Sequence, residues 1–440
     1  MRLTGWGRYP AHETDFTSPD TEAELARALQ SGETIARGNG RAYGDSAIGP
    51  GRTVGMRGFH HMLSFDDRTG VLVAEAGVLL SDIIATFLPR GWFPAVTPGT
   101  KFVTLGGMIA ADVHGKNHHK DGSMAGCVQW VDVMDQHGQV RRCSRTQNAD
   151  LFAWIPGAMG LTGVIVRAAI KLRPVATGWI NQTTIPAPNL KSAMIIFEGA
   201  QDFTYSVAWI DCLQSGRAMG RSLVMLGEHA LPDHLTFRER RDPFAQKPKR
   251  QKRLPFDAPD FMLSGPVVRA FNSLYYWKGS RNAGTSLVDW DTYFYPLDAI
   301  LEWNRAYGRR GFVQFQCALP LESSEAGLGA LLRAISKAGS GSFLAVLKRF
   351  GAQGGSFSFP MPGYTLALDF PANPANLALL HELDAITIDH GGRFYLAKDA
   401  RMTADVLRQS DKRVPDFIAT RAALQTDRAF RSAQSERLSL

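Results

Sequence analysis

Three histidines and two lysines lie within one short stretch of the chain, ADVHGKNHHKDGS: His114, Lys116, His118, His119 and Lys120. Imidazole rings bind metal ions or transfer protons, and ammonium groups hold anions. His114 and His118 stand four residues apart, as on one face of a helix, but Gly115 and Asn117 disfavour a helix here. No H-E-x-x-H pattern accompanies them, so we expect no metal site. Hydrogen bonds to loop backbone are the simplest interpretation of His118 and His119.

Three glycine-rich loops surround this stretch in the sequence: ARGNGRAYGDS (36–46), PGTKFVTLGG (98–107) and GAMGLTG (157–163). Glycine lets backbone N–H groups approach phosphate oxygens and adopt positive φ angles. None of the loops has the third glycine of a dinucleotide fingerprint or a following G-K-[ST]. One loop of this kind is usually a turn. Three in one amino-terminal stretch favour a large ligand that contains a pyrophosphate.

The elements that must position these loops are strands and helices in an α+β arrangement. The sequence predicts a helix through DTEAELARALQ, opened by Ser18 and Pro19, and a strand over 71–76 followed by a helix. Alternation on both sides of His137 and Gly138 predicts a hairpin. Beyond residue 176, FTYSVAWIDC, GFVQFQCALP and YTLALDFP are strands separated by helices. They predict an antiparallel sheet covered on one face.

Composition limits the class of protein. The 440 residues suggest two to three domains, and the formal charge of +8 makes an anionic partner plausible. Lys and Arg dominate residues 238–253, but no nucleic-acid-binding signature accompanies them, so we expect no nucleic acid. A solvated loop or attraction to anionic lipid or phosphate explains this run. The four scattered cysteines argue against disulfides and structural zinc.

Localisation is also predicted from composition. The apolar runs are too short to span a membrane, and the start MRLTGWGRYP lacks the apolar stretch of a secretory signal peptide. We therefore expect a protein made in the cytoplasm, there or peripherally at the inner membrane.

The loops also carry a family resemblance. The order R-G-x-G-R-x-Y-G-D, P-G-T, G-G-x-I-A-x-D-x-H-G-K-N-H-H and G-x-x-G-L-T-G resembles flavin oxidases of the vanillyl-alcohol-oxidase type, in particular the branch that oxidises polyprenylphosphoryl ribose. LTGWGRYP, EWNRAYG, SFPMPGY and YLAKDAR extend the resemblance over nearly the whole chain. It implies an FAD-binding α+β domain over residues 1–176, completed by 393–440. It also implies an antiparallel-sheet substrate-binding domain over 177–392, with a mobile basic loop at about 230–260.

The resemblance implies FAD as cofactor, with its pyrophosphate on residues 36–46. Arg41 stands where relatives with covalent flavin have a histidine, so we expect non-covalent FAD. The implied FAD contacts are Ala36, Arg37, Gly38, Asn39, Gly40, Arg41, Ala42, Tyr43, Gly44, Asp45, Ser46, Gly99, Thr104, Leu105, Gly106, Gly107, Ala111, Asp112, Val113, His114, Ile165 and Tyr395.

Oxidation of a secondary alcohol by flavin requires a base for the hydroxyl proton and positive charge near the reduced flavin. The resemblance makes Lys398 the first candidate for either role, Tyr43 the second, and His114 a contact of flavin and substrate. Gln314 and Gln316 alternate on a strand, which puts both on one face. The implied substrate contacts are Lys116, Trp209, Tyr295, Leu297, Gln314, Gln316, Thr365 and Lys398.

Two positions depart from mycobacterial members of this branch. Ala367 replaces a cysteine that faces the flavin, and Thr365 replaces an asparagine. Loss of the thiol argues against covalent trapping by nitroaromatic inhibitors. It leaves hydride transfer intact and hints at a lineage with a different substrate.

The resemblance implies oxidation of the 2-hydroxyl of a polyprenylphosphoryl-β-D-ribose, or a related pentose, to the 2-keto sugar. A separate NADH-dependent keto-sugar reductase would complete a 2-epimerisation, and the basic loop would receive the lipid substrate at a membrane. One alternative is a flavin oxidase of a soluble sugar, such as an aldonolactone or alditol. Another is a non-enzymatic protein that binds anionic lipid or nucleic acid on a flavin fold.

Overall fold

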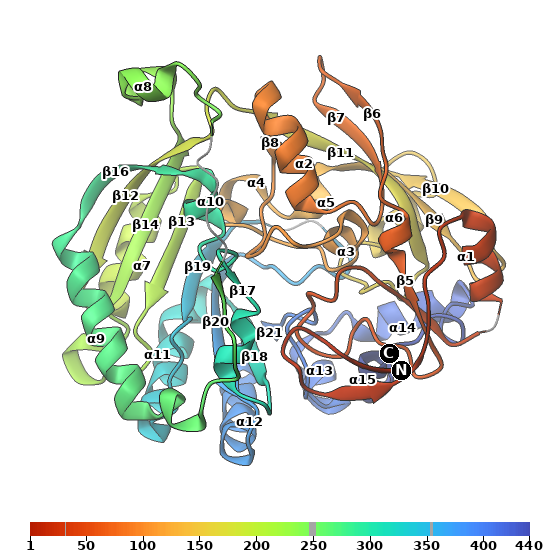
Figure 1. Cartoon of the computed structure of the whole chain (residues 1–440). Coiled ribbons are helices and arrows are strands. Elements are labelled where there is room, and N and C mark those ends of the chain that lie inside the picture. The colour runs from red at the N-terminus through yellow and green to blue at the C-terminus, as the bar shows by residue number, and fades with distance from the viewer. Residues whose placement is uncertain (31, 246–251, 353–354) are drawn as a thin grey trace.

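The amino-terminal part of the chain forms two stacked sheets, to which the last helices return (Figure 1). The computed structural model describes residues 1–30, 32–245, 252–352 and 355–440. A small parallel sheet has the strand order β3-β5-β4, and a larger antiparallel sheet has the order β10-β9-β11-β7-β6, with β8 on the far end of β11. The strands are β3 (Asp15–Thr17), β4 (Thr34–Arg37), β5 (Arg52–Gly55), β6 (Met62–Asp66), β7 (Val71–Glu75), β8 (Trp92–Pro94), β9 (Val128–Met134), β10 (Val140–Ser144) and β11 (Val164–Pro174).

Short helices connect these strands, and β1 (Arg2–Thr4) pairs with β2 (Ala11–Glu13) beside them. The helices are α1 (Glu22–Leu29), α2 (Leu80–Phe87), α3 (Leu105–Ala110), α4 (His118–Asp121), α5 (Met124–Cys127) and α6 (Ala149–Trp154). Thr104 caps α3 by accepting a hydrogen bond from the Gly107 N–H, which fixes the start of this helix beside the first glycine loop.

The middle of the chain forms an eight-stranded sheet with the order β16-β12-β14-β13-β19-β20-β18-β21. All of its pairs are antiparallel, as the alternating segments predicted. Its strands are β12 (Trp179–Ala187), β13 (Tyr205–Ile210), β14 (Ser222–His229), β16 (Gly284–Asp289), β18 (Phe312–Pro320), β19 (Val346–Phe350), β20 (Gly363–Pro371) and β21 (Arg393–Phe394).

Helices cover this sheet unequally. One face packs against α7 (Leu190–Gly199), α11 (Leu321–Ala338) and α12 (Pro374–Asp389). Tyr364 of β20, for example, meets the ring of Phe197 and the carbonyl of Met194 on α7. The other face looks toward the amino-terminal part; α9 (Gly265–Arg281) packs at its outer edge, and α10 (Trp290–Phe294) packs its Tyr293 and Phe294 rings on Tyr205. The sheet is therefore covered by helices mainly on one face, as predicted.

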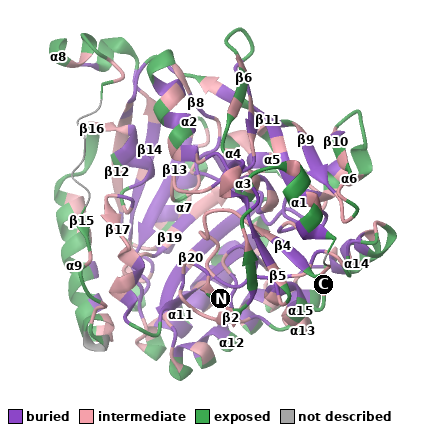
Figure 2. Cartoon of the chain, turned by 45° about the vertical axis from the view of Figure 1, so that its right-hand side comes forward, coloured by how far each residue is buried: buried purple, intermediate pink, exposed green. Residues whose placement is uncertain are grey.

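The C-terminal stretch joins the two parts. β21 pairs with β18, so residues 393–394 extend the eight-stranded sheet. The chain then crosses to the amino-terminal part as α13 (Ala404–Ser410), α14 (Val414–Ala423) and α15 (Ala433–Leu438). One buried hydrophobic cluster includes Leu72 and Val131 of the first part and Leu366 of the second (Figure 2). The domain boundaries at 176/177 and 392/393 remain our proposal, which the separate sheets support.

The predicted basic loop lies between β14 and α9. It contains α8 (Phe237–Arg240) and β15 (Lys252–Arg253), which pairs with β17 (Ile300–Leu301). Residues 246–251 of this loop lie outside the described residues. Within the described ranges, every helix is too short or too polar to cross a bilayer.

Candidate active site

Strand pairing gathers polar side chains on the uncovered face of the large sheet. Gln314 lies opposite Asp369, and Gln316 lies opposite Ala367. Because directly opposite residues point to the same face, and residues two apart do also, Thr365 and its partner Lys348 join them. Gln314 Nε2 donates to Asp369 Oδ1 at 2.5 Å. The predicted sharing of one face by Gln314 and Gln316 is therefore correct.

His114 faces this sheet from the loop after α3. The Gln316 amide lies 3.1 Å from His114 Nε2 and 3.2 Å from Thr365 Oγ1. Since Thr365 donates its own proton to the Cys317 carbonyl, the Gln316 nitrogen is the donor to both neighbours. His114 Nε2 then accepts, and the ring proton is on Nδ1, which is buried without a partner in the described part of the chain. Burial, and then Lys348, hold the pKa of His114 well below its usual range, so the ring is neutral at pH 7.

Three lysines surround the same space. Burial and then Lys348 lower the pKa of Lys116 to about 7, and its ammonium contacts the Tyr293 carbonyl and lies 4.2 Å from the Tyr293 ring. Burial lowers the pKa of Lys348 to about 8. Burial also lowers the pKa of Lys398 to about 7, although Asp369 opposes this shift. Lys348 repels both Lys116 and Lys398 in a poorly solvated space, and such a site favours an anion.

Lys398 and Asp369 are buried groups of opposite charge, and each shifts the pKa of the other. Lys398 Nζ lies 3.6 Å from the centre of the Tyr43 ring. Burial raises the pKa of Asp369 to about 7, while its bonds to Gln314 and Tyr307 oppose this. Both groups thus titrate close to neutral pH, where a general base is most effective. Burial raises the pKa of Tyr43 well above its usual range, so Tyr43 keeps its hydroxyl proton.

The first glycine loop presents unused donors. In the described part of the chain, the backbone N–H groups of residues 38–42 have no acceptor, and Ser46 Oγ and Arg41 Nε are buried without one. A Cβ on Gly38 would lie 2.2 Å from Thr104 Oγ1, and Asn39 donates to the Phe102 carbonyl at 2.7 Å. The loops 36–46 and 98–107 therefore touch each other, and their free donors fit the phosphate oxygens of FAD.

The base of this loop is joined to the Lys398 segment by an ion network. Arg437 of α15 bonds Asp45 at 2.7 Å and Asp399 at 3.0 Å. Tyr43 N–H donates to the Ala397 carbonyl at 2.9 Å. The C-terminal helices thus fix both the cofactor loop and the position of Lys398.

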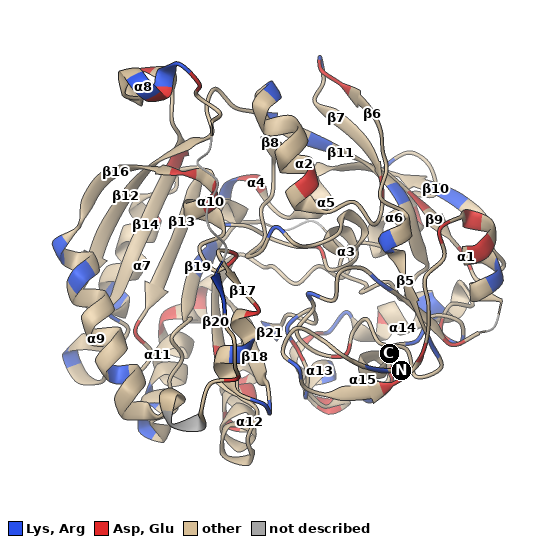
Figure 3. Ribbon diagram, viewed as in Figure 1, with Lys and Arg blue, Asp and Glu red and all other residues tan. Residues whose placement is uncertain are grey.

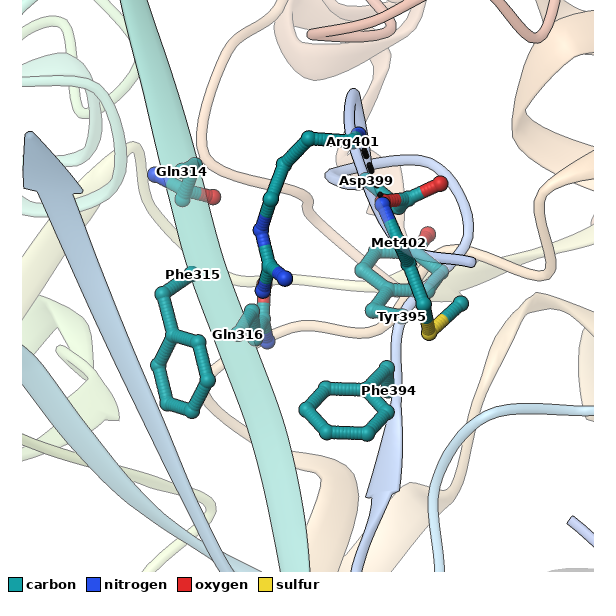
Figure 4. Close-up of a pocket in the computed structure, with 8 residues that line it drawn as sticks. All are labelled: Gln314, Phe315, Gln316, Phe394, Tyr395, Asp399, Arg401 and Met402. Carbon is teal, nitrogen blue, oxygen red and sulfur yellow. Dashed lines mark hydrogen bonds between the residues drawn. The ribbon is translucent and has the colours of Figure 1, made fainter. Parts of the chain in front are cut away.

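Residues 394–402 also pack across β18. Figure 4 shows Gln314 and Gln316 on the strand, opposite Phe394, Tyr395, Asp399 and Arg401, around a cavity of about 10 Å³. Asp399 Oδ1 accepts from the Arg401 N–H at 3.0 Å. Tyr395 donates its hydroxyl to the Ala111 carbonyl at 2.9 Å, and its ring stacks on Phe359. Tyr395 therefore ties the Lys398 segment to the loop that carries His114.

Some of the residues considered in the sequence analysis form hydrogen bonds within the protein. His118 Nδ1 accepts from the Gly351 N–H, and His119 contacts the Phe203 carbonyl, as expected for backbone partners. Asp112 caps α5 by accepting from Ser123 and Ala125. Across the described ranges, no group of three His, Cys, Asp or Glu side chains has the geometry to hold a metal ion.

The predicted wall of the substrate pocket is spread over a wider area. Trp209 lies on the face of the sheet that carries Gln314 and Gln316. Its ring packs on Tyr275 of α9, and its indole N–H donates to the Phe343 carbonyl. Tyr295 is 1% exposed and its hydroxyl has no partner among the described residues. Leu297 is half-buried beside it. Of the three, Tyr295 offers a buried polar atom to a ligand.

Sequence reasoning missed Lys348 and Asp369. Each lies in an apolar strand segment, AVLKRF and TLALDF, without a local motif. The one available signal was a charged residue at an alternating position of a strand that would otherwise be buried on both faces.

Comparisons with known proteins agree with this geometry. Residues 16–144 match the model of the FAD binding domain family. Decaprenylphosphoryl-beta-D-ribose oxidase of Mycolicibacterium smegmatis is 33% identical over the whole chain and 97% of that protein. An uncharacterised protein of Streptomyces coelicolor is 32% identical over 82% of this chain and all of its own. L-gulonolactone oxidase of Mus musculus is 28% identical over 40% of this chain and 41% of its own.

These matches establish the cofactor and the class of reaction. The protein is an FAD-dependent oxidoreductase with the two-part α+β fold of the vanillyl-alcohol-oxidase type. With 33% identity over its full length, the chain belongs to the family of decaprenylphosphoryl-β-D-ribose oxidases.

Proposed function

We propose that this enzyme oxidises the 2-hydroxyl of a polyprenylphosphoryl-β-D-ribose, or a related pentose, to the 2-keto sugar. The observation that carries the proposal is the position of Lys116, Lys348 and Lys398 around one face of β18, β19 and β20. A sugar phosphate supplies the anion that this cluster favours, and the full-length relative acts on such a substrate.

Residues 36–46 would hold FAD without a covalent bond, and the bound FAD would accept the hydride of the oxidised carbon. Lys398 as the neutral amine takes the hydroxyl proton, because its pKa of about 7 leaves a large neutral fraction at pH 7. The ammonium that results is stabilised by the Asp369 carboxylate. Lys398 thus serves first as base and then as a positive charge.

The remaining groups bind the substrate. Lys116 and Lys348 hold the phosphate, and Gln316 accepts from ribose hydroxyls through Oε1, because its amide nitrogen is engaged with His114 and Thr365. His114 remains neutral and offers its Nδ1 proton. Tyr43 keeps Lys398 in place through its ring.

A 2-keto sugar needs a further enzyme, and we propose an NADH-dependent reductase that returns it to the opposite epimer. Oxidation of a soluble sugar is the weaker alternative, because the lactone-oxidase match covers only 40% of the chain. A non-enzymatic binding role does not explain a basic amine of lowered pKa, with two further lysines near it, beside a cofactor cradle.

The position of oxidation is tested by trapping the product. After turnover of a short-chain polyprenylphosphoryl ribose, borodeuteride reduction should give both the ribose and the arabinose epimer, separated by chromatography of the released sugars, and their mass spectra should place the deuterium at C2. Deuterium at C1 or C3, or no incorporation, would contradict the proposal.

Replacement of Lys348 tests the phosphate contact. We expect Lys348→Met to raise KM for the phosphorylated substrate by roughly 10- to 100-fold with little change in kcat, because a charge-assisted hydrogen bond contributes about 1.5–3 kcal/mol. Steady-state kinetics measure this. The matched control is Arg349→Met, one residue along β19 on the opposite face and paired with Glu198, which should keep the wild-type KM.

Replacement of Asp369 tests its electrostatic effect on Lys398. Asp369 raises the pKa of Lys398, so Asp369→Asn removes that effect and the acid limb of the kcat/KM profile should move to lower pH. The maximal rate should fall, because a less basic amine accepts a proton less readily. If the acid limb stays in place or moves to higher pH, Asp369 does not raise the pKa of Lys398.

A further inference from the structure

Helix α9 is the least covered long helix of the large sheet, although it carries large apolar side chains. Of its 17 residues, only Val268 and Asn272 are buried. Val267 and Phe271 are each 41% exposed and Leu274 is 62% exposed. These positions follow at spacings of four and three, so they form one stripe along the helix, with Phe271 at its inner border, where its ring meets Phe343.

Basic residues continue this apolar stripe toward the end of α9. Lys278 and Arg281 extend it by four and three residues, and the sequence of α9 contains no acid. Trp277 is 52% exposed and lies under the Arg281 guanidinium, 4.3 Å from ring centre to Cζ. Exposed tryptophan next to basic residues is typical of segments that lie at a membrane–water interface. Figure 3 marks the Lys and Arg positions along α9 and on α8 in blue on the ribbon.

The segment before α9 adds to this surface. Phe256 is 63% and Met262 is 45% exposed. Asp257, which follows Phe256, is already paired with Arg8 and Arg305. Figure 2 shows α8, β15 and α9 along one edge of the molecule, with α9 largely exposed. We call Phe256, Met262 and the exposed residues of α9 the α9 edge.

The α9 edge adjoins the substrate side of the sheet. Tyr275 of α9 packs on Trp209, with ring centres 4.7 Å apart. Trp209 lies opposite Val346, two residues before Lys348, so α9 rests on the face that carries the lysine cluster. A surface on which α9 docks would therefore lie on the same side of the sheet as the lysine cluster.

We propose that the α9 edge docks on a membrane surface that contains anionic lipid. Phe271, Leu274 and Trp277 would enter the interfacial region, and Lys278 and Arg281 would meet the lipid headgroups. The proposal rests on the proposed function in that a polyprenyl-linked substrate is dissolved in such a membrane.

Vesicle binding tests the proposal without relying on turnover. The FAD-loaded full chain is sedimented with vesicles of phosphatidylcholine, with or without phosphatidylglycerol. Wild type should bind the anionic vesicles and lose binding as salt rises. Leu274→Glu/Trp277→Glu should bind at least roughly tenfold more weakly, since two exposed apolar anchors become repulsive charges. The matched control is Ile195→Glu/Leu321→Glu, which changes two exposed apolar residues of α7 and α11 and should bind like wild type.

Two further measurements separate the outcomes. The double variant should keep wild-type FAD absorbance and turnover of a soluble short-chain substrate, which shows that it folds and that the site is intact. Equal vesicle binding by the variant and the control would overturn the proposal. So would a wild-type dimer in light scattering that the variant loses while neither protein binds vesicles, because the α9 edge would then pair with a second copy. Absence of ribose oxidation with normal vesicle binding would contradict the proposed function alone.

Discussion

Lys398→Ala is expected to lower the rate of substrate-dependent FAD reduction by about 10³-fold, within the range that loss of a general base produces. Neither Tyr43 nor His114 can replace Lys398 as the base, because Tyr43 keeps its proton and the accepting nitrogen of His114 is engaged by Gln316. Anaerobic stopped-flow absorbance at the flavin band measures the rate. The FAD content should stay at the wild-type level.

Chemical rescue distinguishes a base from a structural lysine. Added methylamine should restore part of the rate of Lys398→Ala in proportion to its neutral fraction, so rescue should increase with pH. In wild type, kcat/KM should fall as pH drops below about 7, because the neutral amine is lost there. A variant within tenfold of wild type, or activity that rises toward low pH, would exclude Lys398 as the base.

Gly44→Ala is expected to give protein with less than about a tenth of the normal FAD. A Cβ on Gly44 would lie 2.1 Å from the Asp399 carbonyl and 2.7 Å from Ala400 Cα, and backbone atoms cannot rotate away as side chains do. The loop must shift, which breaks the Tyr43 bond to Ala397 and the cradle together. FAD is measured by absorbance after denaturation of the purified protein.

Gly199→Ala is the matched control for this substitution. An added Cβ on Gly199, at the end of α7, meets nothing within 4 Å, so FAD content should not change. Full FAD content in Gly44→Ala would show that the close approach of loop 36–46 to the Lys398 segment is not needed for the cofactor.

Much of the fold follows from local pattern. The hairpin at His137 and Gly138 forms as β9 and β10, because alternation and a turn act over neighbouring residues. The helix after Ser18 and Pro19 also forms, but it begins at Glu22. Thr21, and not Ser18, accepts the capping bond from Glu24, because the capping oxygen must lie three residues before its donor.

The site is less predictable because its parts meet through long-range pairing. The glycine loops and YLAKDAR identify residues one segment at a time. Lys348 and Asp369 become neighbours of Lys398 only when β19, β20 and β18 align side by side. Register across a sheet depends on the packing of both faces, which no single segment encodes. Trp209 illustrates the same limit, since the sequence did not indicate that Tyr275 of α9 packs on its ring.

The most direct test of the proposed function is the anaerobic visible spectrum of the purified enzyme, before and after addition of a short-chain polyprenylphosphoryl ribose. We predict a yellow protein whose flavin band bleaches with this substrate and not with free ribose or an aldonolactone. Bleaching by the soluble sugars alone would contradict the assignment of a lipid-linked pentose as substrate. The fold and the FAD cofactor would be unaffected by that result.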